Sequence, residues 1–203
     1  MNTTKDFILG ECLKLFLRKS FKDVTLKEIV ETTRLSKGAF YHYFTSKESL
    51  FLEVIDTFFT KMIVFDFGAY SQESLFRFYH DHINDLGKMV TELTDINGSL
   101  SIREIPDFNY LYPLFDALRM IPEYHNKIQK AREYELEQWT MAIERAMASG
   151  EIKSLMAAGH LAKMFIFSGN GIGLNIIMSN RPAGDIKESF TDLWDGFYES
   201  LKS

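Results

Sequence analysis

The segment from Val24 to Leu50 constrains the fold more than any other part of the chain. Thr25, followed by Glu28 three positions later, has the pattern of a capping box, which starts a helix. Ser36 is a suitable N-cap for a second, very short helix. Thr45 or Ser46 can cap the helix that follows. Because so short a helix is unstable alone, it must pack against its neighbours. The segment therefore predicts a helix-turn-helix followed by the start of a further helix.

The rest of the sequence favours helices as well. Val and Thr never cluster in alternating runs, and only four prolines interrupt the chain. Apolar residues recur instead every three or four positions, as in amphipathic helices. We predict an all-α protein of about nine helices, with a three-helix helix-turn-helix domain at residues 1–46 and a larger helical domain at residues 47–203. The expected helices cover residues 4–19, 26–31, 37–44, 47–59, 72–94, 107–118, 122–148, 157–179 and 185–201.

Charge is distributed unevenly along the chain. The formal net charge is -5, which alone argues against a nucleic-acid partner. Between Lys14 and Lys47, however, eight Lys or Arg stand against three Asp or Glu, so this block carries +5 and the remainder carries -10. A basic N-terminal block on an acidic body suits phosphate contact at one end of the molecule.

Cysteine usage and the apolar segments indicate the compartment. The chain has one cysteine, Cys12, and its neighbours are apolar, so we expect a buried thiol in a reducing environment. The first residues lack the pattern of a signal peptide. The apolar segment 161–178 contains polar residues and is short for a membrane span, which favours a buried helix. We therefore predict a cytoplasmic protein without a membrane partner.

The second short helix has the features of a DNA recognition helix. Its first turn, Lys37, Gly38 and Ala39, would meet base edges, since small residues allow a close backbone approach and the lysine can reach a phosphate or a guanine. The polar aromatic run that follows offers hydroxyl and imidazole groups to phosphates. Free amides at the helix starts near Thr25 and Lys47 can hold further phosphates. The residues predicted to contact DNA are Thr25, Lys37, Gly38, Ala39, Tyr41, His42, Tyr43 and Lys47.

For each of these residues a plainer interpretation exists. Lysines on a helical hairpin can be solvated, and aromatic residues can belong to the core. Phe40 and Phe44, four positions apart, share one helix face and are expected to pack inward. The combination of caps, basic residues and aromatic residues in one short helix favours the DNA-binding interpretation.

Three stretches of this segment resemble the N-terminal signature of the tetracycline-repressor (TetR) family. They are Val24–Ile29 (VTLKEI), Leu35–Phe44 (LSKGAFYHYF) and Ser46–Leu50 (SKESL), and the resemblance extends over residues 5–60. It implies a homodimeric transcription regulator with an all-α body that a ligand releases from DNA. Carried over by position, it implies the DNA contacts Thr25, Lys37, Gly38, Tyr41, His42, Tyr43 and Lys47.

The sequence departs from the family pattern at two positions. Arg34 stands in the turn where the family usually has glycine, so either Arg34 has a positive φ or the turn differs. Ala39 stands where Thr or Ser is frequent, which removes one hydroxyl contact.

The last two predicted helices are the expected dimer interface, because the first of them is apolar nearly all round. Three glycines in that helix do not fit the spacing of a phosphate loop, so we interpret them as small residues that admit a close helix approach. Two chains would form a four-helix interface. The residues predicted for it are Phe165, Gly169, Ile172, Gly173, Ile176, Phe190, Trp194 and Phe197.

Control of DNA binding requires a cavity in the helical domain. The 18 phenylalanines and nine methionines of the chain favour a small apolar or aromatic effector. The residues predicted to line its pocket are Phe78, Tyr79, His82, Met89, Phe108, Tyr110, Phe115, Trp139 and Phe167. An aromatic residue at helical spacing is, however, more often part of the core.

No motif typical of an enzyme competes with the interpretation as a DNA-binding regulator. The sequence has no Walker loop, Cys-x-x-Cys pair or recognisable Ser/His/Asp set, and in His80-Asp81-His82 the two imidazoles point to different helix faces. We predict no enzyme activity, cofactor or metal, and a DNA-binding repressor of a palindromic operator. The alternative is a helical ligand-binding or interaction protein that has lost specific DNA binding.

Overall fold

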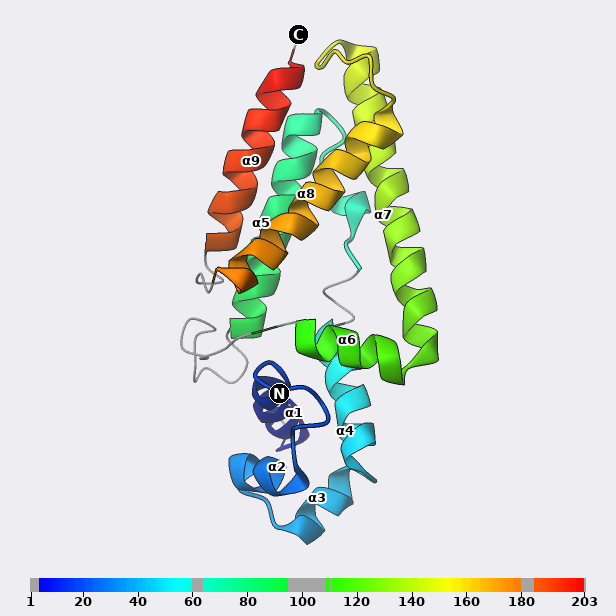
Figure 1. Cartoon of the computed structure of the whole chain (residues 1–203). Coiled ribbons are helices and arrows are strands. Elements are labelled where there is room, and N and C mark those ends of the chain that lie inside the picture. The colour runs from blue at the N-terminus through cyan, green and yellow to red at the C-terminus, as the bar shows by residue number, and fades with distance from the viewer. Residues whose placement is uncertain (1–3, 60–63, 95–108, 110, 180–184, 203) are drawn as a thin grey trace. The chain divides into compact units, whose positions relative to one another are not determined.

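The structure is a computed structural model that describes residues 4–59, 64–94, 109, 111–179 and 185–202. These residues form α-helices connected by loops and contain no strand beyond an isolated bridge between Ile152 and Lys202, so the all-α prediction is confirmed. The helices, shown in Figure 1, are α1 (Thr4–Phe16), α2 (Leu26–Thr33), α3 (Lys37–Tyr43), α4 (Lys47–Val54), α5 (Leu75–Thr94), α6 (Leu111–Met120), α7 (Pro122–Ser149), α8 (Ala158–Met178) and α9 (Ile186–Leu201).

Several helix bounds differ from the expected ones. The first helix stops at Phe16 instead of residue 19, α2 continues to Thr33, α5 begins at Leu75, and α6 covers Leu111–Met120. Beyond Val54, α4 continues to the expected residue 59 as a π-helical turn, Ile55–Phe59. The long helix begins with Pro122 as predicted, because proline needs no amide partner in a first turn. It ends before Gly150, whose φ of 78° is favourable for glycine.

The chain divides into two compact units, Met1–Ile63 with Glu92–Lys127, and Val64–Thr91 with Ile128–Ser203. The first unit contains α1 to α4 and α6, and the second contains nearly all of α5 and α7 together with α8 and α9. The functional boundary predicted at residue 46 stays a prediction.

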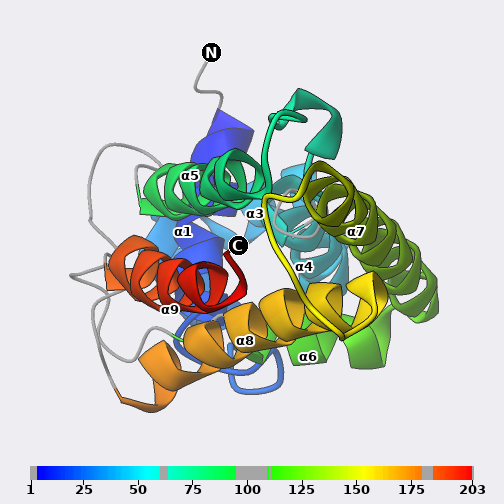
Figure 2. The same cartoon turned by 90° about the horizontal axis from the view of Figure 1, so that it is seen from above.

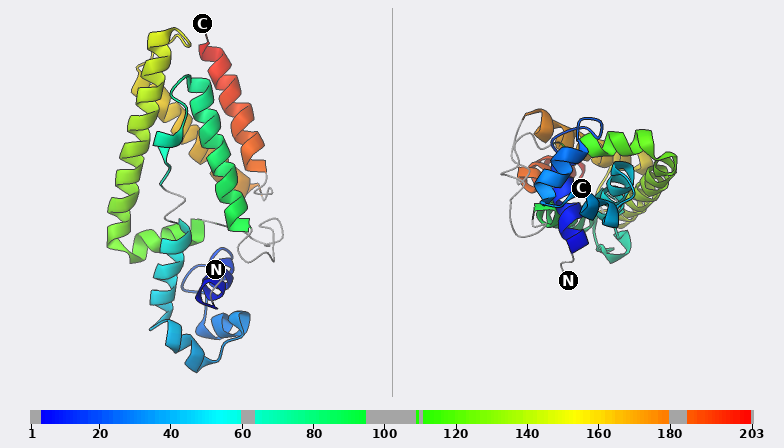
Figure 3. Two further views of the ribbon diagram at one scale, coloured as in Figure 1. Left: turned by 180° about the vertical axis from the view of Figure 1, so that it is seen from behind. Right: turned by 90° about the horizontal axis from the view of Figure 1, so that it is seen from below.

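The first unit has an aromatic core. In it α1 packs against α2 and α4 (Figure 3), and the rings of Phe16, Phe21 and Phe51 lie 4.9–6.2 Å apart between centroids. Cys12 is buried in α1, as predicted, and burial raises the pKa of its thiol to about 12. The thiol is therefore a protonated core group.

The second unit is a packed helical body in which α5, α8 and α9 lie side by side (Figures 1 and 2). Trp139 of α7 joins the four helices, since its ring centroid lies 5.1–5.2 Å from those of Phe78 on α5, Phe165 on α8 and Trp194 on α9. Gly169 allows α8 and α9 to approach closely. A Cβ at this position would lie 2.8 Å from the ring of Phe190, a distance that real Cβ atoms do not show.

Candidate DNA-binding interface

The start of α2 is fixed by the predicted capping box. Thr25 Oγ1 accepts a hydrogen bond from the Glu28 amide at 3.2 Å, and Glu28 Oε2 accepts one from the Thr25 amide at 2.9 Å. Lys19 Nζ lies 2.5 Å from Glu28 Oε1. This lysine, followed by the Thr25 amide, lowers the pKa of Glu28 to about 2. The carboxylate therefore stays ionised at physiological pH and holds the N-terminal end of α2 in place.

The turn between α2 and α3 is closed by Arg34 in the left-handed region, with φ 56° and ψ 26°. A positive φ was one of the two predicted consequences of replacing the usual glycine. For a residue with a Cβ this conformation costs on the order of 1 kcal/mol. Around it, the Arg34 amide donates to Glu31 O and the Leu35 amide to Val30 O, so the turn is well bonded. The exposed Arg34 side chain adds a further positive charge here.

One face of α3 is anchored and the opposite face is free. Ser36 caps the helix by accepting from the Ala39 amide at 3.1 Å, as predicted. Phe40 and Phe44 are both buried, with ring centroids 5.7 Å apart, which confirms that they pack inward. Tyr41 is 51% exposed, so its ring and hydroxyl group are accessible to a ligand.

The structure brings the predicted DNA contacts together on α3 and the two adjacent helix starts. Five of them are exposed: Thr25, Lys37, Gly38, Tyr41 and His42. The others are half-buried: Ala39, Tyr43 and Lys47.

Lys47 has a structural role that the sequence did not indicate. Its Nζ donates to the backbone oxygens of Phe21 and Val24, both at 2.7 Å, and lies 4.1 Å from the centroid of the Phe21 ring. Two of its three ammonium hydrogens are thus used inside the domain. The predicted contact of Lys47 with a phosphate would use the remaining hydrogen and stays a prediction.

The predicted effector residues are divided between the two units. Phe78, Tyr79, His82 and Trp139 lie together in the core of the second unit, and Met89 packs against it. Phe115, by contrast, is exposed on α6 in the first unit, and Phe167 is exposed on α8. Helical spacing did not reveal which face is outward at these two positions, and their assignment to the pocket stays a prediction. Phe108 and Tyr110 lie outside the described residues.

The residues predicted for the dimer interface pack largely inside one chain, and their assignment to that interface stays a prediction. Six are buried: Phe165, Gly169, Gly173, Ile176, Phe190 and Trp194. Ile172 and Phe197 are partly buried against the same core.

The exposed face of α8 carries a different apolar stripe, which the sequence analysis missed. Its positions follow the alternating three- and four-residue spacing of a helix–helix seam. Phe167, 64% exposed, lies near its middle. We call these residues the α8 stripe: Met164, Phe167, Gly171, Leu174 and Met178.

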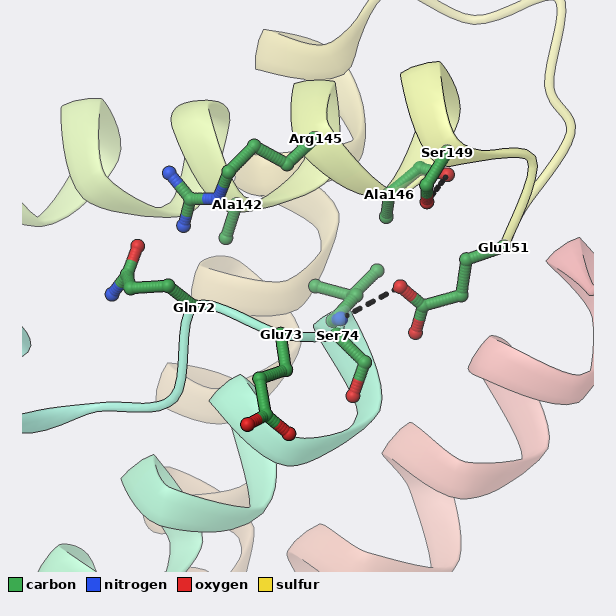
Figure 4. Close-up of a pocket in the computed structure, with 9 residues that line it drawn as sticks. Gln72, Glu73, Ser74, Ala142, Arg145, Ala146, Ser149 and Glu151 are labelled. Atoms are coloured by element: carbon green, nitrogen blue, oxygen red, sulfur yellow. Dashed lines mark hydrogen bonds between the residues drawn. The ribbon is translucent and has the colours of Figure 1, made fainter.

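A small pocket of about 140 Å³ lies where the start of α5 meets the end of α7 (Figure 4). Glu151 fills the usual anion position at the start of α5, with Oε2 accepting from the Leu75 amide at 2.9 Å and Oε1 from the Phe76 amide at 3.1 Å. The carboxylate thus fastens the loop after α7 to α5. This polar pocket differs in its residues from the predicted effector site.

These features define a helix-turn-helix: α2 has a capped start, a tight turn follows it, and α3 has one anchored and one exposed face. In sequence, a larger helical body follows. Residues 8–54 match the family described as bacterial regulatory proteins, tetR family. This N-terminal segment is therefore of the type found in TetR-family transcriptional regulators. No helix in the described part of the chain has the length and apolar character to cross a membrane.

Known regulators are similar to this chain over different lengths. The uncharacterized HTH-type regulator YfiR of Bacillus subtilis is 21% identical over 88% of this chain and 82% of its own length. The regulator QacR of Staphylococcus aureus is 42% identical, but over 26% of this chain and 28% of QacR. Among solved structures, a TetR transcription regulator of Haloarcula marismortui aligns over 98% of both chains with a TM-score of 0.64 at 13% identity, which shows a shared fold. The MbdR regulator of Azoarcus sp. CIB aligns over 93% and 95% of the two chains with a TM-score of 0.63 at 14% identity.

Proposed function

We propose that the protein is a cytoplasmic repressor that binds a palindromic operator as a homodimer and is released by a small effector. The observation that carries DNA binding is the exposed polar face of α3, with Lys37, Tyr41 and His42, above two buried phenylalanines. A helix fixed from one side and free on the other can enter a major groove without losing its own packing.

Dimerisation is supported by the α8 stripe. A two-turn reading helix buries too little surface to bind tightly alone, whereas two copies separated by about 34–36 Å read two half-sites. Phe167, Leu174 and Met178 leave large apolar side chains in water unless a partner covers them. The same surface on a second chain is the simplest partner, because a two-fold interface pairs a patch with itself.

The first test replaces Tyr41 by alanine. A duplex selected from a random-sequence pool by the wild-type protein should be bound at least tenfold more weakly, since roughly 1–3 kcal/mol of groove contacts are lost. Titration of a labelled duplex measures this, and circular dichroism checks that helicity is unchanged. Tyr134→Ala, an equally aromatic and 43% exposed position on α7, should bind as the wild type does.

Equal binding by both variants would contradict the assignment of the reading surface. If the wild-type protein selects no sequence from the pool, the protein is instead a helical ligand-binding or interaction protein without specific DNA binding.

The effector is supported by two polar groups in the aromatic core of the second unit. His82 is buried, and desolvation lowers its pKa to about 3, so its imidazole is neutral. Trp139 Nε1 is also buried and has no hydrogen-bond partner among the described residues. A buried donor without an acceptor costs about 1–3 kcal/mol. An uncharged aromatic ligand with one acceptor atom would satisfy this donor and fit the neutral surroundings.

This ligand class can be tested with two probes of the same shape. The chain has two tryptophans, so Trp194→Phe leaves Trp139 as the fluorescent reporter. At pH 8 quinoline, whose ring nitrogen accepts a hydrogen bond, should quench this fluorescence and raise the melting temperature more than naphthalene does. Trp139→Phe should remove the difference in melting temperature. Equal responses to both probes, or none, would contradict the proposed class.

A further inference from the structure

A buried carboxylate of α6 holds the loop between α1 and α2. Asp116 is only 6% exposed, and its Oδ2 accepts a hydrogen bond from the Phe21 amide, 95 positions earlier in the chain, at 2.5 Å. Its Oδ1 accepts from Arg119 at 2.7 Å. A second bond ties the same regions together, from the Asn109 amide to Leu17 O at 2.8 Å. The segment around α6 therefore contacts the loop at two separate places.

The opposite side of this loop is held by α4. Lys47 Nζ donates to the carbonyl oxygens of Phe21 and Val24. The backbone of Phe21 is thus bonded by a carboxylate at its N–H and by an ammonium at its C=O. Its ring packs between Phe16 and Phe51, so the residue is fixed through side chain and main chain alike.

The position of the loop determines where α2 begins. Val24, whose carbonyl is bonded by Lys47, directly precedes the cap residue Thr25. Thr25 and the first amides of α2 are the groups proposed to meet a phosphate. A shift of the loop would therefore move this phosphate contact while leaving the side-chain anchors of α3 in place.

We infer that Asp116 is a positioning residue for DNA binding, which sets the phosphate contact at the start of α2 by holding the Phe21 amide. The inference rests on the proposed DNA-binding function. Asp116 lies in the part of the sequence assigned to the effector-binding domain, beyond residue 46. A movement of α6 would reach the start of α2 through this carboxylate and the loop that it holds.

The experiment compares Asp116→Ala with Asp116→Asn in the full-length protein. Asparagine retains an oxygen that accepts from the Phe21 amide, whereas alanine leaves that amide without a partner. We expect Asp116→Ala to accelerate hydrogen exchange at the Phe21 amide at least tenfold and to weaken binding of the selected duplex at least tenfold. Phosphate-ethylation interference should show the loss of one phosphate contact per half-site, while base contacts of α3 persist. Asp116→Asn should keep most of the protection of the Phe21 amide and most of the affinity for the duplex.

Glu135→Ala is the matched control. Glu135 is also 6% exposed and is bonded to an arginine three positions away, Arg132, at 2.7 Å, but it lies on α7 in the second unit. Its removal should lower the melting temperature to a similar extent without changing the interference pattern. Where Asp116→Ala fails to fold, Asp116→Asn is compared with Asp116→Leu, which has the shape but no acceptor.

The outcomes separate the two proposals. Suppose that the wild-type protein binds DNA and that the variants without an acceptor at position 116 keep the same affinity and the same pattern of phosphate contacts. This result would overturn the inference and leave the DNA-binding proposal intact. Equal losses in Glu135→Ala would also overturn it, because the effect would then be one of stability. Absence of sequence-specific binding by the wild-type protein would overturn the proposed function itself.

Discussion

Replacing Phe167 by glutamate is expected to convert a dimer into a monomer and to weaken operator binding more than a hundredfold. The side chain is 64% exposed in the single chain and lies near the middle of the α8 stripe. In a dimer the substitution would bury a carboxylate against its own symmetry mate, at a cost of at least several kcal/mol. Since the free monomer keeps residue 167 in water, its folding should change little. Sedimentation equilibrium and duplex titration measure the two effects.

Leu155→Glu is the control for this experiment. Leu155 is fully exposed in the loop after α7 and lies outside the α8 stripe, so its replacement should leave mass and affinity unchanged. A Phe167→Glu protein that keeps the dimer mass would show that the stripe is not the interface. A wild-type protein that sediments as a monomer would contradict dimerisation altogether.

The features that the sequence predicted correctly depend on residues close together in the chain. The capping box of Thr25 and Glu28 spans three positions, and so does the cap that Ser36 provides for α3. The inward packing of Phe40 and Phe44 follows from a spacing of four. Local geometry decides such features, and therefore the helix-turn-helix could be read before any tertiary contact was known.

The sequence could not show which faces of the helices are buried. Because α8 is apolar on nearly every side, its periodicity does not identify the side that packs against the chain's own core. That choice is made by Trp139 and Trp194, which come from α7 and α9 and enclose Phe165. The sequence analysis assigned residues of the buried face to the dimer and Phe167, on the exposed face, to the effector pocket.

The roles of Asp116 and Lys47 could not be predicted from spacing. Asp116 bonds an amide 95 positions away, and Lys47 bonds carbonyl groups 26 and 23 positions earlier. The sequence analysis assigned Lys47 to a phosphate contact and gave Asp116 no role. A charged side chain that bonds backbone groups of a distant loop leaves no local pattern.

The two lysines of the reading surface should respond differently to salt. Lys37 is exposed on the first turn of α3, whereas Lys47 uses two of its three ammonium hydrogens on backbone oxygens. A lysine that neutralises one phosphate contributes about 0.9 to the slope of log K against log salt concentration for each chain. Lys37→Met should therefore reduce the slope of the dimer by about 1.8 and weaken binding at least tenfold at low salt.

Lys47→Met should act on stability first. Methionine keeps an apolar stem over the Phe21 ring but leaves the Phe21 and Val24 carbonyl groups without their charged donor, at a cost of roughly 1.5–3 kcal/mol in the free energy of unfolding. Urea denaturation measures this cost. The salt slope of the folded variant should equal that of the wild type, because no phosphate loses its counter-charge. A slope reduced as far as in Lys37→Met would mean that the ammonium of Lys47 leaves the loop and binds the DNA.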